Sequence, residues 1–264
     1  MTLITMGAGN VLVLKETLKS FSACCDEIIY GDLLLFPEDR ETVKSYQKEF
    51  NIKIIPFDFN YLFKYGFSAL LNVLASYATN DIVMYMNTSE VIDEDYGISK
   101  IINSNPDCNS FYFTHRQENH RWFRCYNRHE LEWSGRIHEQ LKGEFKPYHK
   151  PIFMMKDLPK DMGDPFKAKV FDTLKEIFYF NNYIAIVDNP NELGETDPSW
   201  LKFSTDGYDS FKERLNKKGI AYEAVKNGDY KLFMDYVNNS PDFDNQKFES
   251  NISIEYQNDK KFLL

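Results

Sequence analysis

Short apolar runs alternate with helical patterns over the first 90 residues of the chain. The apolar runs at residues 2–6, 26–32, 53–56 and 82–86 predict strands, and the segments 11–21, 41–50 and 67–78 carry apolar residues at helical spacing. Strands that alternate with helices in this way form a mostly parallel sheet with helices packed on its faces. The pattern therefore predicts an α/β fold with a Rossmann-like nucleotide-binding sheet.

Further along the chain the pattern changes. Residues 95–103 predict a helix, residues 110–114 a strand, and the alternation over 120–128 a strand with charged side chains on one face. After Pro151 the segments 164–180, 208–218 and 230–237 have the spacing of amphipathic helices, and a polar tail follows from Ser240. We therefore place a boundary near Lys156, with a nucleotide-binding domain at 1–155 and a mostly helical C-terminal extension at 156–264.

The most informative stretch follows the apolar run 82–86, which breaks abruptly into Asn87, Thr88, Ser89 and Glu90. In open α/β sheets, ligands bind beyond the carboxyl ends of the strands. The oxygens of this four-residue motif could bind a hard divalent cation or the hydroxyls of a ribose. The alternative is structural, because Thr88 or Ser89 could be the N-cap of a helix that follows.

Two further features lie at predicted strand ends. Gly7 and Gly9 form a glycine loop between a strand and a helix, where backbone amides can approach phosphate. A dinucleotide fingerprint needs a third glycine, and Leu12 stands there instead, so a simple tight turn is the alternative. Asp32 ends the second predicted strand and could bind a ribose or a uracil, or cap a turn.

Composition narrows the class of protein. Of the 264 residues, 43% are hydrophobic, which is enough for a real core, and the formal net charge of -9 argues against general nucleic-acid or anionic-membrane binding. No stretch has the length of a membrane span or the pattern of a signal peptide. The four cysteines lack metal-ligand spacing. We expect a soluble, reduced, cytoplasmic protein.

In this order, the motifs of residues 2–151 resemble the family 2 glycosyltransferases of the GT-A fold. The matching features are the first strand with its loop, the acidic-apolar strand that ends at Asp32, the helix that carries Ser68 and Asn72, the 87–90 motif, the run Arg121-Trp122-Phe123-Arg124, and the pair His138-Glu139. The family's central motif is Asp-x-Asp-Glu, of which only Glu90 remains here. The glycines of the first loop also depart from the family.

The resemblance implies a hexosyl or related transferase with a nucleotide-sugar donor and a hydroxyl acceptor. It implies Glu139 as the catalytic base, with Glu118 and Asp93 as alternatives, and Arg121 as a second catalytic residue. It implies a nucleotide-sugar site formed by Met6, Gly7, Ala8, Asp32, Lys64, Ser68, Asn72, Asn87, Thr88 and Ser89. Trp122 and Trp133 could stack on sugar rings or lie in the core.

A divalent cation such as Mn²⁺ or Mg²⁺ would stabilise the diphosphate leaving group in this family. Glu90 and His138 are the candidate ligands, and Asn87 could add an amide oxygen. Because two aspartates are missing, we expect weak metal dependence, and Arg121, Arg124 or Lys64 could supply the positive charge instead.

Three hypotheses follow from the sequence. The first is an active nucleotide-sugar glycosyltransferase, weakly dependent on a metal. The second is a catalytically inactive module that binds a nucleotide sugar. The third is an NAD(P)-dependent oxidoreductase built on the glycine loop and Asp32, and the missing third glycine counts against it.

Overall fold

The computed structural model of this 264-residue chain describes most of its first 159 residues. The described residues are 1–7, 11–33, 36–57, 59–116, 118–135 and 140–159, with Asp164, Lys167, Leu232 and Asp235. The chain divides into two compact units. The first comprises Met1–Phe57, Leu71–Trp133 and Gln140–Asp164, and the second comprises Asp58–Leu70, Ser134–Glu139 and Pro165–Leu264.

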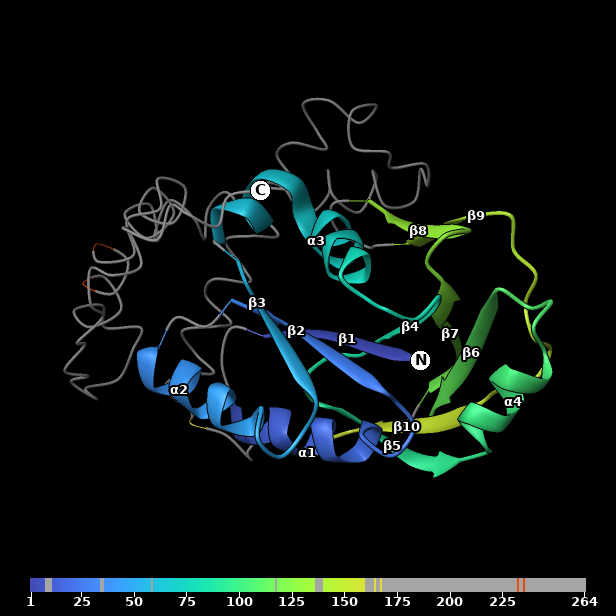
Figure 1. The fold of residues 1–264 in the computed structure, drawn as a ribbon, viewed down its shortest axis with the longest axis horizontal. Coiled ribbons are helices and arrows are strands. Elements are labelled where there is room, and N and C mark those ends of the chain that lie inside the picture. The colour runs from blue at the N-terminus through green and yellow to red at the C-terminus, as the bar shows by residue number, and fades with distance from the viewer. Residues whose placement is uncertain are drawn as a thin grey trace. The chain divides into compact units, whose positions relative to one another are not determined.

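Within the described residues, the first unit is built on an eight-stranded mixed sheet (Figure 1). In spatial order its strands are β3 (Ile52–Pro56), β2 (Glu27–Asp32), β1 (Thr2–Gly7), β4 (Ile82–Tyr85), β7 (Glu118–Asn127), β6 (Ser110–His115), β10 (Phe153–Asp157) and β5 (Glu90–Asp95). Strands β3, β2, β1 and β4 run parallel, as does the pair β6–β10, whereas β7 is antiparallel to both neighbours and β5 is antiparallel to β10. Strands β8 (Leu131–Ser134) and β9 (Gln140–Gly143) form a separate pair. The predicted α/β class with a mostly parallel sheet is confirmed.

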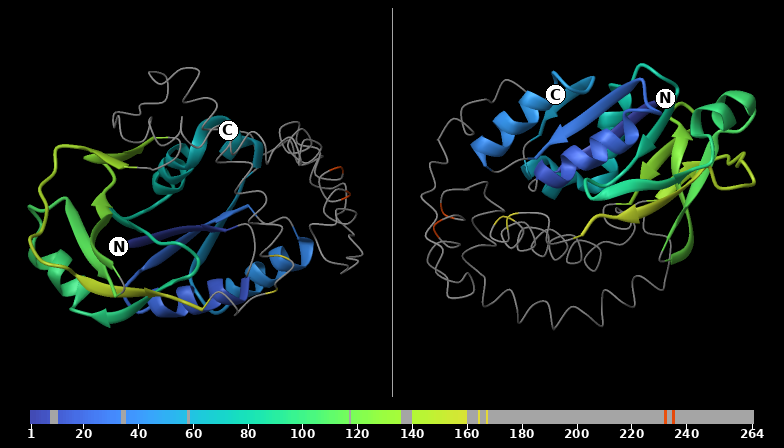
Figure 2. Two further views of the ribbon diagram at one scale, coloured as in Figure 1. Left: turned by 180° about the vertical axis from the view of Figure 1, so that it is seen from behind. Right: turned by 90° about the horizontal axis from the view of Figure 1, so that it is seen from below.

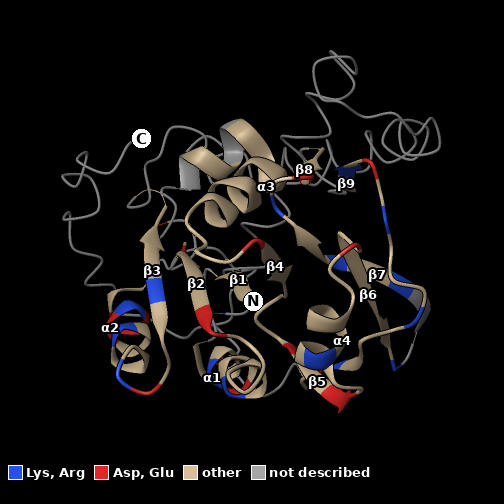
Figure 3. Ribbon diagram, turned by 45° about the vertical axis from the view of Figure 1, so that its right-hand side comes forward, with Lys and Arg blue, Asp and Glu red and all other residues tan. Residues whose placement is uncertain are grey.

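Helices α1 (Val11–Phe21) and α2 (Pro37–Tyr46) lie side by side on one face of β1, β2 and β3 (Figures 1 and 2). The apolar residues of α1 face this core, among them Leu14, Leu18 and Phe21, whose exposed fractions are near zero. Helix α2 carries both acidic and basic residues (Figure 3). Amphipathic helices of this kind take most of their stability from the buried face.

Figure 1 shows the part of α3 (Phe59–Ser76) that belongs to the first unit, from Leu71 onward, on the face of the sheet opposite α1 and α2. Gly31 in β2 permits this approach, because an added Cβ atom there would lie 3.1 Å from Leu74 Cδ1 and 3.1 Å from Met6 Cβ. A side chain at position 31 would therefore push the helix away from the strand.

Two predicted helix starts were wrong, those of α2 and α4 (Ile98–Ser104). Helix α2 begins at Pro37 rather than residue 41, because proline at the first helical position needs no N–H partner. Helix α4 begins at Ile98 rather than at the predicted residue 95. The Asp95 carboxylate instead accepts hydrogen bonds from the backbone N–H groups of Gly97 and Ile98, at the start of the helix. The helix start predicted at residue 67 is confirmed, because α3 (Phe59–Ser76) is interrupted by non-helical backbone at Gly66 (φ 82°), and the sequence pattern missed only the helical segment before it.

The helix that would follow an N-cap at Thr88 or Ser89 does not form, so that alternative is also wrong. Residues from Glu90 onward form β5, whose partner is β10, a strand that the sequence pattern did not predict. Strand β10 crosses the predicted boundary at residue 155 and ends at Asp157. Apart from Asp164, Lys167, Leu232 and Asp235, the predicted helical extension after residue 159 lies outside the described residues, so the domain division stays a prediction.

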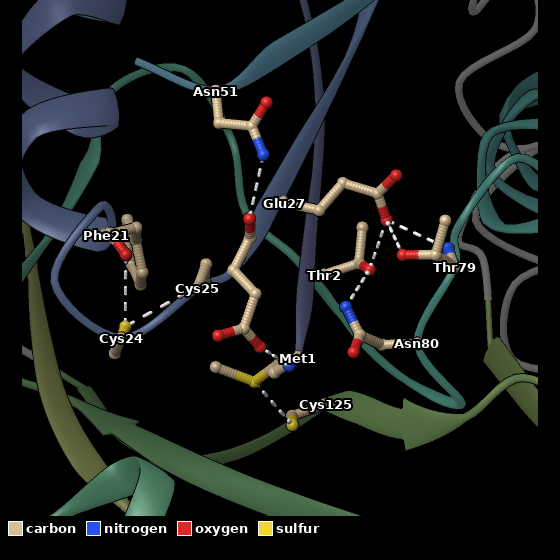
Figure 4. A network of polar contacts seen from close by, with 11 residues as sticks. Met1, Thr2, Phe21, Cys24, Cys25, Glu27, Asn51, Thr79, Asn80 and Cys125 are labelled. Carbon is tan, nitrogen blue, oxygen red and sulfur yellow. Dashed lines mark hydrogen bonds and ion pairs between the residues drawn. The ribbon is translucent and has the colours of Figure 1, made fainter.

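Polar contacts of Glu27 join β1, β2 and the segment before β4, at the amino-terminal ends of the strands (Figure 4). Glu27 Oε2 accepts hydrogen bonds from Thr2 Oγ1 (2.8 Å), the Thr79 backbone N–H (2.9 Å) and Thr79 Oγ1 (3.1 Å). Burial by itself would raise the pKa of Glu27, but the hydrogen bonds from Thr79 and Thr2 outweigh it, so this pKa lies below its ordinary value.

Replacing Glu27 with Gln is expected to lower the free energy of unfolding by about 1 kcal/mol at pH 7, because charge-assisted hydrogen bonds become neutral ones. A depressed carboxyl pKa stabilises the fold above the pKa of the unfolded chain, and this contribution is lost as the pH falls through the folded pKa. Urea unfolding at pH 7 and in acid measures the difference between wild type and variant, which should disappear in acid. Glu16→Gln, on the exposed side of α1, is the control, and an equal loss there would contradict the assignment.

Candidate functional site

The carboxyl ends of β1, β2 and β4 meet at one edge of the sheet. Gly7 at the end of β1 is in register with Asp32 at the end of β2, and Ile4 is in register with Tyr85, the last residue of β4. Residues 87–90 follow β4 directly and form a turn closed by the Glu90 N–H and the Asn87 carbonyl (3.2 Å). The structure therefore confirms that Asp32 and Glu90 lie at the same edge of the sheet.

The side chain of Glu90 holds this 87–90 turn together. Its Oε1 accepts a hydrogen bond from Asn87 Nδ2 and its Oε2 accepts one from the Asn87 backbone N–H, both at 2.7 Å. The Asn87 amide oxygen accepts from the Tyr85 hydroxyl (2.7 Å). The turn is thus closed by hydrogen bonds among its own side chains and β4.

Arg124 in β7 completes the contacts of Glu90. Its Nη1 donates to Oε1 and to Oε2 of Glu90, each at 2.9 Å. The side chains of Glu90 and Arg124 are only 5% and 12% exposed, so little solvent screens this ion pair. The guanidinium carbon lies 4.4 Å from the Trp122 ring centre and 5.3 Å from the Tyr85 ring centre, which adds cation–π attraction.

Neighbouring elements fix the backbone of the turn. Thr17 Oγ1 in α1 donates to the Thr88 carbonyl (2.8 Å), and the Leu158 N–H donates to the Ser89 carbonyl (2.8 Å). Gly7 approaches so closely that an added Cβ atom would lie 3.0 Å from Thr88 Cγ2 and 3.0 Å from the Tyr30 hydroxyl. The turn is therefore held from the first strand, the first helix and the chain after β10.

Asp32 is buried and forms an ion pair with Arg40 of α2, with 2.7 Å between Asp32 Oδ2 and Arg40 Nε. The sequence pattern placed Asp32 at this edge but missed Arg40, because the predicted helix began only at residue 41. The proline at position 37 was the signal that could have placed Arg40 on the first turn of a helix. The Asp32 side chain is only 4% exposed and that of Arg40 is 28% exposed, so Arg40 is the more accessible member of the pair.

The other predicted site residues are spread over both units, and three of them lie outside the described residues. Met6 is buried in β1, and Asn72 forms hydrogen bonds with both backbone groups of Trp133, through Nδ2 (2.8 Å) and Oδ1 (2.9 Å). Arg121 is exposed on β7, with its guanidinium 5.2 Å from the Tyr112 ring centre. Lys64 and Ser68 belong to the part of α3 that the second unit contains. Ala8, His138 and Glu139 lie outside the described residues, and the roles predicted for all these residues stay predictions.

Trp133, which the sequence offered as a sugar-stacking ring or a core residue, and Asp93, an alternative base, both contact other side chains of the first unit. The Trp133 ring is buried and meets the rings of Tyr85 and Tyr126 edge to face, at centre distances of 5.9 and 5.8 Å, so it belongs to the core. Asp93, an alternative base, forms ion pairs with Lys156 (2.7 Å) and Arg116 (2.8 Å).

The described residues of the site do not fit the divalent cation that the resemblance implies. The one acid of the 87–90 turn already forms four hydrogen bonds, two on each oxygen. The part of the chain that the structure describes contains no cluster of three His, Cys, Asp or Glu side chains placed to hold a metal. His138, the second predicted ligand, lies outside the described residues.

No protein-family model matches this sequence, and no curated protein matches it. Among solved structures, the chain is similar to S. aureus TarS 1–349 at 11% identity and a TM-score of 0.41, covering 88% of each chain. It is similar to the same fragment in complex with UDP-GlcNAc at 10% identity and a TM-score of 0.41, covering 92% of this chain and 80% of that one. It is also similar to this fragment in complex with UDP, at 11% identity and a TM-score of 0.42. No helix among the described residues is both long enough and apolar enough to span a membrane.

Proposed function

We propose that the chain is a glycosyltransferase that moves a sugar from a nucleotide-sugar donor to a hydroxyl acceptor. One observation carries this proposal: Gly7, the Asp32–Arg40 pair and the 87–90 turn lie together at the carboxyl edge of a parallel sheet. Ligands of open α/β sheets bind at this edge. The order of motifs along the chain adds the glycosyltransferase class to this general expectation.

The proposed donor site has two parts, one for the nucleobase and ribose and one for the ribose and diphosphate. Asp32 and Arg40 bind the nucleobase or ribose, and the backbone near Gly7 lies beside the nucleotide together with Met6 and Ala8. Asn87, Thr88 and Ser89 line the donor next to the ribose and diphosphate.

In the transfer step, the acceptor oxygen forms a bond to the anomeric carbon while the bond from that carbon to the diphosphate oxygen breaks. The nucleoside diphosphate leaves with the electron pair. Glu139 takes the proton of the acceptor hydroxyl, and Arg121 provides positive charge for the leaving diphosphate. Both residues carry over from the resemblance, as do Lys64, Ser68 and Asn72 in donor binding.

A catalytically inactive nucleotide-sugar-binding module is the second candidate. The observation in its favour is that Glu90, the one acid left of the family's motif, is fully engaged by Asn87 and Arg124. An inactive module would bind the donor and release no nucleoside diphosphate.

A thermal-shift series with UDP, UDP-GlcNAc, GDP- and CMP-sugars and NAD(P), followed by assays for released nucleoside diphosphate, separates the candidates. UDP and UDP-GlcNAc come first because they are the ligands in the TarS complexes. Stabilisation by a sugar nucleotide with release supports the transferase, whereas stabilisation without release in the presence of varied acceptors supports the inactive module. Stabilisation by NAD(P) alone contradicts both.

Asp32→Asn is expected to weaken binding of the stabilising nucleotide about tenfold, because the buried acceptor loses its charge. The matched control is Asp26→Asn, because Asp26 lies just before β2, at the end of the strand opposite to Asp32. Isothermal titration measures both affinities. Equal affinities for wild type and Asp32→Asn would place the nucleotide elsewhere.

A further inference from the structure

The charge and the hydrogen-bonding capacity of the Glu90 carboxylate are both fully used within the protein. An ionised carboxylate has about four lone-pair positions, two on each oxygen. All four are used in Glu90, by Asn87 N, Asn87 Nδ2 and two contacts from Arg124 Nη1, at 2.7 to 2.9 Å. A cation could bind Glu90 only by displacing one of these donors.

The electrostatics of the pair lead to the same conclusion. Glu90 and Arg124 together have zero net charge, and both are largely shielded from solvent. A divalent cation beside them would face the guanidinium at close range, and in a poorly solvated site that repulsion is large. Arg124 is also fixed in place, because Trp122 and Tyr85 lie against its guanidinium.

The amide oxygen of Asn87 offers no better ligand. It accepts the Tyr85 hydroxyl at 2.7 Å, and the amide nitrogen of the same side chain is bound to Glu90. To present this oxygen to a metal, the amide would have to leave the Tyr85 hydroxyl. The nearby acid Asp93 is likewise bound, by Arg116 and Lys156.

We propose that Arg124 occupies the place of a divalent cation in this site. Its guanidinium holds the carboxylate that would otherwise bind the metal, and Glu90 becomes a positioning residue that fixes the 87–90 turn. The site then binds a nucleoside diphosphate without a divalent cation. Removing the charge of Arg124 would free Glu90 to act as a metal ligand, so a neutral substitution at position 124 would create metal binding rather than abolish it.

The test compares wild type, Arg124→Gln, Arg124→Lys and the double variant Glu90→Gln/Arg124→Gln as full chains. Electron paramagnetic resonance of free Mn²⁺ measures metal binding without nucleotide, and UDP titration in Mn²⁺ and in EDTA measures metal dependence. Wild type and Arg124→Lys are expected to bind no Mn²⁺ and to show equal UDP affinities in the two buffers. Arg124→Gln is expected to bind Mn²⁺ about tenfold more tightly than the double variant, because it alone exposes a charged oxygen ligand.

Arg116→Gln is the control for the loss of any arginine, because Arg116 is 62% exposed and Asp93 keeps its contact with Lys156. It should leave Mn²⁺ binding unchanged. The proposal is overturned by a wild type that binds one Mn²⁺ and loses UDP affinity in EDTA, or by a folded Arg124→Gln that gains no Mn²⁺ site. If Arg124→Gln does not fold, wild type and Arg124→Lys still decide whether the site needs a metal.

Only the UDP titration depends on the proposed function. A chain that binds no nucleotide would contradict the glycosyltransferase assignment, whereas the Mn²⁺ titrations would still report whether Arg124 blocks Glu90. The two proposals can therefore fail separately.

Discussion

Replacing Glu90 with Gln is expected to lower the free energy of unfolding by about 3 kcal/mol, because Arg124 would keep its buried charge and lose its counter-ion. The 87–90 turn would also lose charge-assisted hydrogen bonds to Asn87. Because the turn faces the proposed donor site, turnover is expected to fall roughly a hundredfold. Urea unfolding measures the first effect, and release of nucleoside diphosphate measures the second.

Glu94→Gln is the matched control, since Glu94 lies on the same strand and is exposed. The double variant Glu90→Gln/Arg124→Met should recover part of the lost stability, because no unpaired charge remains buried. A Glu90→Gln protein with the stability and turnover of wild type would remove Glu90 from the site and show that the turn needs no ion pair.

Replacing Gly7 with Ala is expected to lower the free energy of unfolding by about 1–3 kcal/mol, because the added methyl group meets Thr88 and the Tyr30 hydroxyl at 3.0 Å. The Tyr30 hydroxyl donates to the Gly7 carbonyl, so Tyr30 has little freedom to withdraw. Thr88 would have to shift, and donor affinity should fall with it. Chemical unfolding and nucleotide titration check the two effects.

Thr88→Ser removes the methyl group Cγ2, which is one of the two atoms that the new side chain meets. The Gly7→Ala/Thr88→Ser double variant should therefore be more stable than the sum of the single changes predicts. Strict additivity of the two changes would mean that Gly7 and Thr88 do not constrain each other.

The parallel half of the fold could be predicted from the sequence because its signals are local. The apolar runs that became β1, β2, β3 and β4 each end in a polar or glycine-bearing segment, and amphipathic helices separate them. Parallel strands connected by helices bring their carboxyl ends to one edge. For that reason, the sequence alone predicts that Gly7, Asp32 and residues 87–90 lie together.

The sequence by itself thus determined the α/β class and the sheet edge at which Gly7, Asp32 and Glu90 lie. Only the tertiary structure decided which partners these residues contact. Residues 90–95 became a strand because β10, about sixty residues later, pairs with them, and Glu90 became a partner of Arg124, 34 residues away. Such contacts join residues that are distant along the chain, and local periodicity has no information about them. The packing of β7 beside β4 put a guanidinium against the only acid of the turn, and our proposal that Glu90 positions the turn instead of binding a metal rests on that contact.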